Sequence, residues 1–237
     1  MKKVLITGTS SGIGKASALK FLENGWEVHG IDIEESTIPF EGRNHNYHHY
    51  VADVGDETTL PNIENEEFDV VINNAATADE DYAIRTNLLG YINVAEKYAF
   101  NPNIKCVINV GSISGRDGLD RPKYAASQGG RISYTKNLAI RLGSIYKARV
   151  NCVSFGAVLT GLEPNLYADE NLVEAVAQEN ILKKWITADE AAEWIYFVGA
   201  IDKCCTGQDI LIDNGEEAAY NWIESEPKKE NRTFSNI

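Results

Sequence analysis

Three glycines near the N-terminus have the spacing of a loop that could bind phosphate groups. The segment Thr7-Gly8-Thr9-Ser10-Ser11-Gly12-Ile13-Gly14 follows a short apolar run and precedes a predicted helix over residues 13–24. Glycines let the backbone turn sharply and approach a pyrophosphate, and the N–H groups and dipole of the helix attract its charge. A tight turn without a ligand is the alternative, but the position of the loop between a strand and a helix favours dinucleotide binding.

The second candidate for cofactor binding is Asp32, which ends the next apolar run. A carboxylate at this place can accept hydrogen bonds from the ribose hydroxyls of adenosine. A 2′-phosphate would meet a like charge, and neither Ser10 nor Ser11 supplies a basic side chain to neutralise it. The sequence therefore favours NAD(H) over NADP(H), whereas the alternative is a solvated Asp at a strand end.

Seven short apolar runs, separated by segments long enough for helices, must position these residues. They are Val4–Thr7, Glu27–Ile33, His48–Val51, Val70–Asn73, Cys106–Val110, Arg149–Val153 and Asp209–Asp213. This alternation predicts parallel strands joined by crossover helices. We therefore expect an α/β fold of the Rossmann type, with a doubly wound parallel sheet of about seven strands between two helical layers.

The chain shows no internal repeat and no linker that would divide it, so we expect one domain over residues 1–215. Within it, residues of about 161–185 are expected to form a substrate lid, whose apolar candidates are Leu162, Leu166, Tyr167, Leu172 and Val173. These could equally pack against the sheet edge. Residues 216–237 read as a polar extension, and the stretch from Glu216 to Trp222 could reach a neighbouring subunit.

The composition excludes several classes of partner. Asp and Glu number 35 against 22 Lys and Arg, which gives a net charge of −13 and makes nucleic acid and anionic membranes poor partners. The apolar run at the N-terminus stops at Ile6, too short for a signal peptide or a membrane span, so a cytoplasmic location is expected. The four cysteines lack the spacing of metal ligands, and no metal is expected.

Further motifs follow the glycine loop in order along most of the chain. After the glycine loop come Asp53-Val54, Asn73-Asn74-Ala75-Ala76, Asn87, Asn109-Val110-Gly111-Ser112, Tyr124-Ala125-Ala126-Ser127, Phe155-Gly156-Ala157-Val158-Leu159-Thr160 and Thr206-Gly207-Gln208. In this order they resemble the single-domain branch of the short-chain dehydrogenase/reductase family, as far as Asn214. Ala76 and Phe155 depart from the Gly and Pro that the family has at these places.

The resemblance implies a site that moves a hydride and a proton together on a small carbonyl or alcohol substrate. Tyr124 would be the acid/base, Ser112 would hold the substrate oxygen, and Asn87 would act through a water in a proton relay. It also implies a homodimer or homotetramer. The implied cofactor contacts are Gly8, Ser10, Ser11, Gly12, Ile13, Gly14, Asp32, Asp53, Val54, Asn74, Ala75, Tyr124, Gln128, Gly156, Val158 and Thr160.

One residue of this catalytic set differs, because Gln128 stands where the family has a lysine that binds the nicotinamide ribose and lowers the pKa of the tyrosine. Glutamine can still bind ribose hydroxyls but carries no charge. A cation about 5 Å from a phenol, at an effective dielectric of ~20, would lower the phenol pKa by on the order of 2 units. Lys123 and Arg131 lie at other helix positions and are not expected to replace the lysine, and we assign Arg131 to a subunit contact.

Three functions are consistent with this combination of retained residues and a replaced lysine. An NAD(H)-dependent oxidoreductase ranks first because Ser112, Tyr124 and Asn87 are all retained, and it predicts that Gln128→Lys increases activity. The second is an NAD-binding regulator or partner subunit without turnover. The third is an isomerase, epimerase or dehydratase that uses bound NAD transiently.

Overall fold

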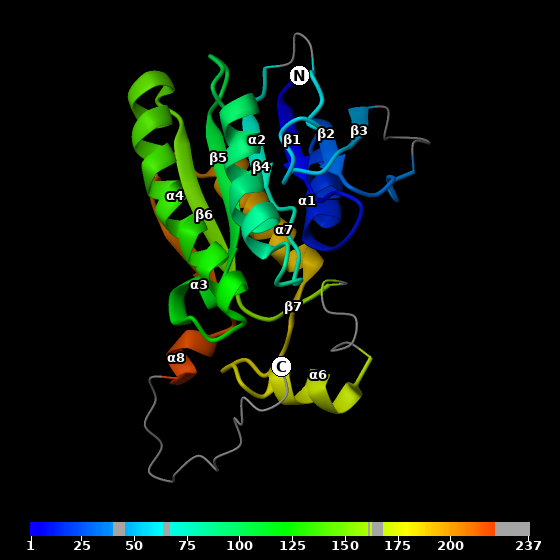
Figure 1. Cartoon of the computed structure of the whole chain (residues 1–237), viewed down its shortest axis with the longest axis vertical. Coiled ribbons are helices and arrows are strands. Elements are labelled where there is room, and N and C mark those ends of the chain that lie inside the picture. The colour runs from blue at the N-terminus through cyan, green and yellow to red at the C-terminus, as the bar shows by residue number, and fades with distance from the viewer. Residues whose placement is uncertain (40–45, 64–66, 161, 163–167, 221–237) are drawn as a thin grey trace.

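A seven-stranded parallel sheet forms the centre of the molecule, in the order β3-β2-β1-β4-β5-β6-β9 (Figure 1). The computed structural model describes residues 1–39, 46–63, 67–160, 162 and 168–220. The strands are β1 (Lys3–Thr7), β2 (Glu27–Asp32), β3 (Tyr47–Val51), β4 (Val70–Asn73), β5 (Cys106–Ser112), β6 (Arg149–Phe155) and β9 (Asp209–Ile212). Each coincides with one of the seven apolar runs, and the predicted fold class is confirmed.

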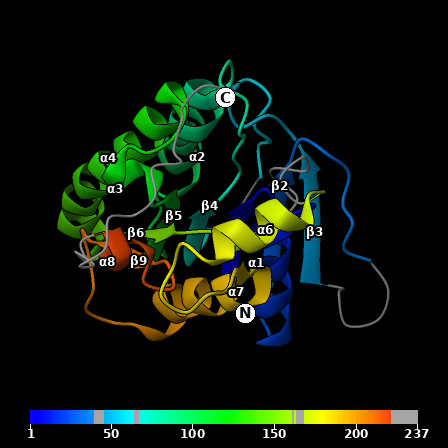
Figure 2. The same cartoon turned by 90° about the horizontal axis from the view of Figure 1, so that it is seen from below.

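Helices cover both faces of this sheet (Figures 1 and 2). On one face lie α1 (Gly12–Glu23), α7 (Ala188–Tyr196) and the π-helical turn η3 (Phe197–Ile201). On the other lie α2 (Gly90–Tyr98), which continues the π-helical turn η2 (Arg85–Leu89), and α4 (Pro122–Tyr146). The result is the predicted three-layer arrangement.

The alternation along β1 shows why its sequence is apolar throughout. Val4 and Ile6 pack with Phe21 of α1, whereas Leu5 packs on the opposite face with Leu138 of α4. All five side chains are fully buried. Because both faces of a parallel sheet are covered by helices, its central strands need apolar residues at every position rather than at every second one.

The order of the strands reverses between β1 and β4, since the chain moves outward through β2 and β3 and then returns to the other side of β1. At such a point the loops after the two strands diverge and leave a crevice at their carboxyl ends. The fold therefore places the glycine loop after β1 beside the Asn73-Asn74 segment that ends β4.

Shorter elements gather at this carboxyl edge, in the lower part of Figure 1. They are α3 (Ser114–Asp117), the paired strands β7 (Val158–Leu159) and β8 (Ile186–Thr187), α6 (Glu170–Ala177) and α8 (Glu216–Tyr220). Of the predicted lid residues, Leu162 and Leu172 are exposed, while Leu166 and Tyr167 lie outside the described residues. Trp185 donates from Nε1 to the carbonyl of Val173 at 2.8 Å and ties the end of this segment to α6.

The beginning of the predicted C-terminal extension contacts the sheet domain of its own chain. Arg116 of α3 forms ion pairs with Glu217 at 2.8 Å and with Asp209 at 2.7 Å. Helix α8 is therefore fixed against α3 and β9, while Asn221, Trp222 and the rest of the tail lie outside the described residues. Within the described ranges, no helix has the length and apolar character needed to cross a membrane.

Candidate functional site

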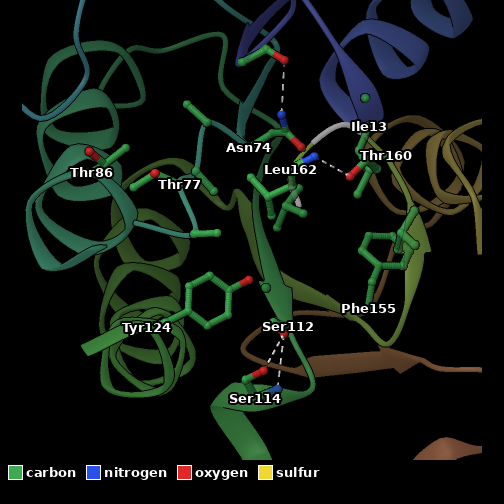
Figure 3. A pocket seen from close by; sticks show the side chains of 18 of the residues that line it. Ile13, Asn74, Thr77, Thr86, Ser112, Ser114, Tyr124, Phe155, Thr160 and Leu162 are labelled. Carbon is green, nitrogen blue, oxygen red and sulfur yellow. Dashed lines mark hydrogen bonds between the residues drawn. The ribbon is translucent and has the colours of Figure 1, made fainter. Parts of the chain in front are cut away.

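A large cavity opens at the carboxyl edge of the sheet, with a volume of about 1330 Å³. Figure 3 shows side chains from its wall, including Tyr124 and Ser112 at one end and Asn74, Ile13 and Thr160 toward the other. The predicted residues that line it are Gly8, Ser11, Gly12, Ile13, Asp32, Asp53, Val54, Asn74, Ala75, Ser112, Tyr124, Gly156, Val158 and Thr160. Ser10, Gly14, Asn87 and Gln128 do not lie on the wall.

The loop after β1 has a shape that its glycines require. Gly8 and Gly12 have positive φ angles of +76° and +51°, in the left-handed region that glycine adopts without strain. A Cβ on Gly14 would lie 2.0 Å from the carbonyl oxygen of Gly8. Gly14 thus lets helix α1 begin directly against the loop, although it does not itself line the cavity. Side chains at these three positions would fill the hollow that the loop forms, which we call the glycine cradle.

Asp32 at the end of β2 is held by the same loop. Its carboxylate accepts hydrogen bonds from the backbone N–H groups of Ser10 at 2.8 Å and Glu34 at 3.0 Å. Ser10 therefore fixes the orientation of Asp32 but does not itself line the cavity. Both carboxylate oxygens keep further lone pairs, which can accept hydrogen bonds from hydroxyl groups.

Asp53 and Val54 follow β3 and also reach the cavity wall. The Asp53 carboxylate accepts a hydrogen bond from the backbone N–H of Gly55 at 2.8 Å and pairs with Arg85. Val54 is 4% exposed and packs closely against Gly90, where an added Cβ would lie 2.7 Å from its Cγ2. This corner of the cavity is thus fixed by contacts within the chain.

Asn74 joins the two strands at the switch point. Its Nδ2 donates to the carbonyl oxygens of Thr7 at 2.9 Å and Gly8 at 3.3 Å. The backbone N–H of Ala75 donates to the Thr7 hydroxyl at 3.0 Å. The end of β4 is thus fixed to the glycine loop, and Asn74 and Ala75 form a continuous wall with it.

Tyr124 and Ser112 meet at the inner end of the cavity. Tyr124 lies in the first turn of α4 and Ser112 ends β5, and the phenol hydroxyl points into the cavity (Figure 3). Both side chains line the same end of the cavity. Ser112 donates to the hydroxyl of Ser114 at 3.1 Å, which in turn donates to Asp120 at 3.2 Å. A substrate oxygen placed here would face both hydroxyl groups, of which that of Ser112 is fixed by Ser114.

The pKa of Tyr124 is raised above its ordinary value. Burial is the largest cause, because it disfavours the charged phenolate, and the carboxylate of Asp120 raises the pKa further. The positive charge of Arg131, the nearby Ser112 hydroxyl and the charge of Arg121 act in the opposite direction. The phenol is therefore protonated at neutral pH in the free protein, as a proton donor to a carbonyl oxygen must be.

The segment after β6 closes the cavity opposite Tyr124. Gly156 donates from its backbone N–H to the carbonyl of Ile212 at 3.0 Å, and a Cβ here would lie 2.8 Å from Oε2 of Glu216. Thr160 packs against the glycine loop, since a Cβ on Gly12 would lie 3.3 Å from its Cβ. The glycine loop and the segment after β6 thus form one continuous surface.

Asn87 is fully buried, and its side chain forms hydrogen bonds with the loop after β4. Its Oδ1 accepts from the N–H of Thr77 at 2.8 Å, and its Nδ2 donates to the carbonyl of Thr77 at 2.9 Å. The backbone carbonyl of Asn87 accepts a hydrogen bond from Nε of Arg131. The Asn87 side chain thus holds the backbone of Thr77 in place, and Thr77 lines the cavity.

Gln128 lies one turn after Tyr124 and is 1% exposed. Its Oε1 accepts a hydrogen bond from Nη1 of Arg131 at 2.8 Å. Its Nε2 is buried and has no hydrogen-bond partner in the described part of the chain. The amide therefore faces Arg131 beneath the cavity, and it does not lie on the wall.

The assignment of Arg131 to a subunit contact is wrong. The side chain is 2% exposed, lines the cavity, and donates to the carbonyls of Asn87 and Val110. Its guanidinium lies 3.9 Å from the centre of the Tyr91 ring. Tyr124, Gln128 and Arg131 have the helical spacing i, i+4, i+7, so they share the face of α4 that packs on the sheet. That spacing was visible in the sequence.

Lys123 lies on the outer side of α4 and forms an exposed ion pair with Asp81 at 3.3 Å. The prediction that it cannot replace the missing lysine is consistent with this contact. Sequence reasoning missed Glu80, whose carboxylate accepts from the backbone N–H groups of Lys123 at 3.0 Å and Tyr124 at 3.1 Å. It thereby caps the start of α4 and fixes the backbone of the tyrosine.

Sequence reasoning also missed several cavity residues outside the motifs. Among them are Thr77, Thr86, Trp185 and Glu216. Glu216 lies on the segment predicted to leave the domain, and its pKa is raised by burial and by the nearby carboxylates of Glu179, Asp213 and Asp117. No local pattern marks these residues, because they reach the cavity only through the folding of separate loops.

The cysteines have no role in this cavity within the described residues. Cys106 and Cys152 are fully buried in strands, and burial raises the pKa of each thiol to about 12. Such thiols carry little thiolate at neutral pH and act as small apolar side chains.

Comparisons with known proteins match this geometry. A family model described as "Enoyl-(Acyl carrier protein) reductase" matches residues 8–217. The 3-oxoacyl-[acyl-carrier-protein] reductase FabG of Thermotoga maritima is 30% identical, over 90% of this chain and 97% of the relative.

Solved structures with bound cofactors have the same fold. A 4-hydroxyisoleucine dehydrogenase complexed with NADH has a TM-score of 0.81 and 26% identity, and ElxO with NADP bound has a TM-score of 0.81 and 28% identity. Each comparison covers 92% of this chain and 99% of the other. The glycine loop, the Ser112–Tyr124 pair and these matches along almost the whole chain agree, and the chain belongs to the short-chain dehydrogenase/reductase family.

Proposed function

We propose that this protein is an NAD(H)-dependent oxidoreductase that acts on a small carbonyl or alcohol substrate. The observation that carries the proposal is that Tyr124 and Ser112 line one end of the cavity whose other end is the glycine cradle. The relatives support it, since they are named as reductases and dehydrogenases. A nicotinamide bound in the cavity would supply or accept the hydride.

The residues of the chain would hold the cofactor and move the proton. The cradle formed at Gly8 and Gly12 fits a pyrophosphate, because backbone and helix N–H groups are the donors that phosphate requires. Ser112 would donate a hydrogen bond to the substrate oxygen, and Tyr124 would give that oxygen its proton during reduction or take it during oxidation. Asn87 would position Thr77 and the loop after β4 around the reacting groups.

The preference for NAD(H) rests on Asp32. Its carboxylate lies on the cavity wall and accepts hydrogen bonds from the backbone N–H groups of Ser10 and Glu34. Ribose hydroxyls can donate to this carboxylate, whereas a 2′-phosphate would be repelled. Structural neighbours bind either NADH or NADP, so the residues at this position must decide the preference here.

The proposed domain spans residues 1–215 with its substrate lid at about 161–185, and α8 contributes Glu216 to the same cavity. We further propose a homodimer or homotetramer. Leu89 on η2 and Ile140 and Ile145 on α4 are 47%, 71% and 61% exposed, and a subunit interface through these helices would bury them.

The test begins with nucleotide-free protein, titrated with NADH and NADPH by nicotinamide fluorescence. Turnover is then measured on a panel of aldehydes, ketones and alcohols, with Tyr124→Phe and Ser112→Ala as variants. We expect tighter binding of NADH and a loss of turnover of about 10²–10⁴-fold in Tyr124→Phe, with NADH affinity kept.

Other outcomes would overturn the proposal in distinguishable ways. Binding of NADH without turnover across the panel would support a non-catalytic NAD-binding protein. Nucleotide that remains bound through purification, together with absent net redox turnover, would favour an isomerase or dehydratase. Absence of binding to either nucleotide would exclude the oxidoreductase and both of these alternatives.

A further inference from the structure

The buried face of α4 carries a positive charge directly beneath the proposed reaction site. Arg131 is 2% exposed and lines the cavity that Tyr124 enters. It contacts neutral groups, namely the carbonyls of Asn87 and Val110, the amide of Gln128 and the ring of Tyr91. A guanidinium stays charged inside proteins, so this charge is buried without a carboxylate partner among these contacts.

A buried charge of this kind destabilises the folded protein unless it is compensated. It is therefore expected to persist only where it has a function. Nη2 of Arg131 and Nε2 of Gln128 are also buried without hydrogen-bond partners in the described residues. Since nearly all buried donors in proteins are satisfied, these two groups indicate that a bound molecule or water completes the site.

We propose that Arg131 is a positioning residue that supplies, from one turn further along α4, the positive charge that Gln128 cannot provide. Gln128 holds the guanidinium in place by accepting a hydrogen bond from Nη1 at 2.8 Å. This inference rests on the proposed function and explains how the family's site operates without its lysine. Against the rise in the Tyr124 pKa that burial causes, the opposing positive charge then comes from Arg131, which Gln128 holds in place.

The charges around Tyr124 support this assignment. Asp120 opposes the formation of a phenolate, and Glu80 accepts from the backbone N–H of Tyr124. Arg121 lies 5.9 Å from the centre of the phenol ring, but its side chain is only half-buried, so water screens its charge. Arg131 is buried, and its charge is the larger of the two in lowering the Tyr124 pKa.

The pair also changes what is expected from restoring the lysine. A lysine at position 128 cannot accept a hydrogen bond, and its ammonium would lie beside the Arg131 guanidinium. Gln128→Lys is therefore expected to displace Arg131 and to decrease activity, the opposite of the increase that the sequence predicts. The variant that restores the family pattern requires Arg131 to change as well, as in Gln128→Lys with Arg131→Met.

The experiment measures the pH dependence of kcat for alcohol oxidation, where the phenolate is the active form. Arg131→Met is expected to raise the apparent pKa by on the order of one to two units, with the KM for NAD changed less than about threefold. Arg131→Lys should keep most of the wild-type profile. The matched control is Arg141→Met, because Arg141 lies on the exposed side of α4 and pairs with Glu96.

Because Arg131 is buried, thermal unfolding is measured first, and Gln128→Met provides a second variant that keeps the charge but loses its fixing hydrogen bond. A folded Arg131→Met protein with the wild-type pH profile would overturn the inference. If no variant and no wild-type protein turns over, the proposed function fails instead. The phenol titration is then read from ultraviolet difference spectra against Tyr124→Phe, and an unchanged Tyr124 pKa in Arg131→Met overturns the inference independently.

A separate cluster on β2 and β3, outside the cavity, carries a second inference. Nε2 of His29 lies 3.2 Å and Nε2 of His48 lies 3.4 Å from Oε1 of Glu27. His29 and His48 are paired neighbours in the sheet register, and all three ligand atoms lie within 4.8 Å of one another. Four ligands around Zn²⁺ at about 2.05 Å lie about 3.3 Å apart, close to the two spacings found here.

We infer that Glu27, His29 and His48 form a site for a divalent transition metal such as Zn²⁺. Imidazole nitrogens with one carboxylate oxygen are ligands that suit this class of ion. The other ring nitrogen of His29 contacts the hydroxyl of Tyr50 at 3.2 Å, which would orient the ring as outer-shell partners of metal ligands do. Lys3 lies 3.7 Å from Glu27 and would move aside.

Zinc binding is tested by isothermal titration with Zn²⁺ and by the visible spectrum of the Co²⁺ form. We expect one metal per chain in the wild type, and an affinity lowered at least tenfold in His48→Ala and in Glu27→Gln. His49→Ala is the control, since His49 contacts Tyr47 and Glu34 on the opposite face of the strand. Absence of saturable binding, or equal binding by all variants, would overturn the inference.

Discussion

The carboxylate of Asp32 accepts a hydrogen bond from the backbone N–H of Ser10 at 2.8 Å. The glycine loop and the carboxylate that would bind the adenosine ribose are thus parts of one unit. Substitution at Asp32 should change both the contacts of the ribose and the charge near its 2′ position.

We predict that Asp32→Asn weakens NADH binding by about 10–100-fold, because hydrogen bonds to a charged group contribute roughly 1.5–3 kcal/mol. Binding of NADPH should become tighter, since the repulsion of its 2′-phosphate is lost. Fluorescence titration with both nucleotides measures the two changes. The exposed Glu35→Gln is the control and should alter neither affinity; a wild-type protein that binds NADPH more tightly would contradict the prediction.

Gly14 contributes to the cradle without lining it. An added Cβ would lie 2.0 Å from the Gly8 oxygen and 2.5 Å from Nδ2 of Asn74, so Gly14→Ala must move the loop backbone. We expect a loss of NADH affinity of more than tenfold and a lower unfolding temperature. Gly129→Ala in α4 is the matched control, because its added Cβ would meet only the Gly115 oxygen at 3.5 Å. Similar effects of both variants would show that the cradle geometry is not responsible.

The sequence predicted the sheet well because both faces are covered, which gives each central strand a continuous apolar run. The glycine loop and Asp32 were also recognisable, since their chemistry is local. The burial of Arg131 was not predicted, although Tyr124, Gln128 and Arg131 share one helix face. Predicting that it turns inward requires the path of α4 across β5, and a fully charged residue is rarely buried without a partner.

Glu216 illustrates a second limit. The polar composition after Gly215 predicted a departure from the domain, yet Glu216 lines the cavity and Glu217 pairs with Arg116. Arg116 lies far away in the sequence, in α3, so no local pattern could connect them. Side chains that close the substrate end of the cavity come from such separate loops, and the substrate itself could not be predicted for the same reason.

Asn87 is expected to act on stability as well as on activity. Asn87→Ala would leave the backbone N–H and carbonyl of Thr77 without their partners, at a cost of roughly 2–4 kcal/mol in the free energy of unfolding. Urea denaturation measures this loss. Asn137→Ala is the control, because Asn137 is exposed on α4 and its substitution should change stability by less than about 0.5 kcal/mol. An effect on kcat without a loss of stability would instead favour the relay role.

The acidic residues near the cavity predict a pH dependence of stability. Burial and the carboxylates of Glu179, Asp213 and Asp117 raise the pKa of Glu216 in the folded state, while a backbone hydrogen bond at Ala157 lowers it less. The folded protein therefore holds this proton to a higher pH than the unfolded chain does. By linkage, the contribution of Glu216 is most favourable below its unfolded pKa of about 4.3 and is lost as the pH rises through the folded pKa.

Glu216→Gln should remove this loss, because the neutral amide can keep the contact at Ala157 and adds no charge. We expect the variant to match the wild type near pH 4 and to be more stable at pH 8, as measured by urea denaturation across this range. Glu57→Gln, at an exposed position away from the cavity, should show no such divergence. A stability difference that is the same at both pH values would mean that the variant acts through packing and not through the charge of Glu216.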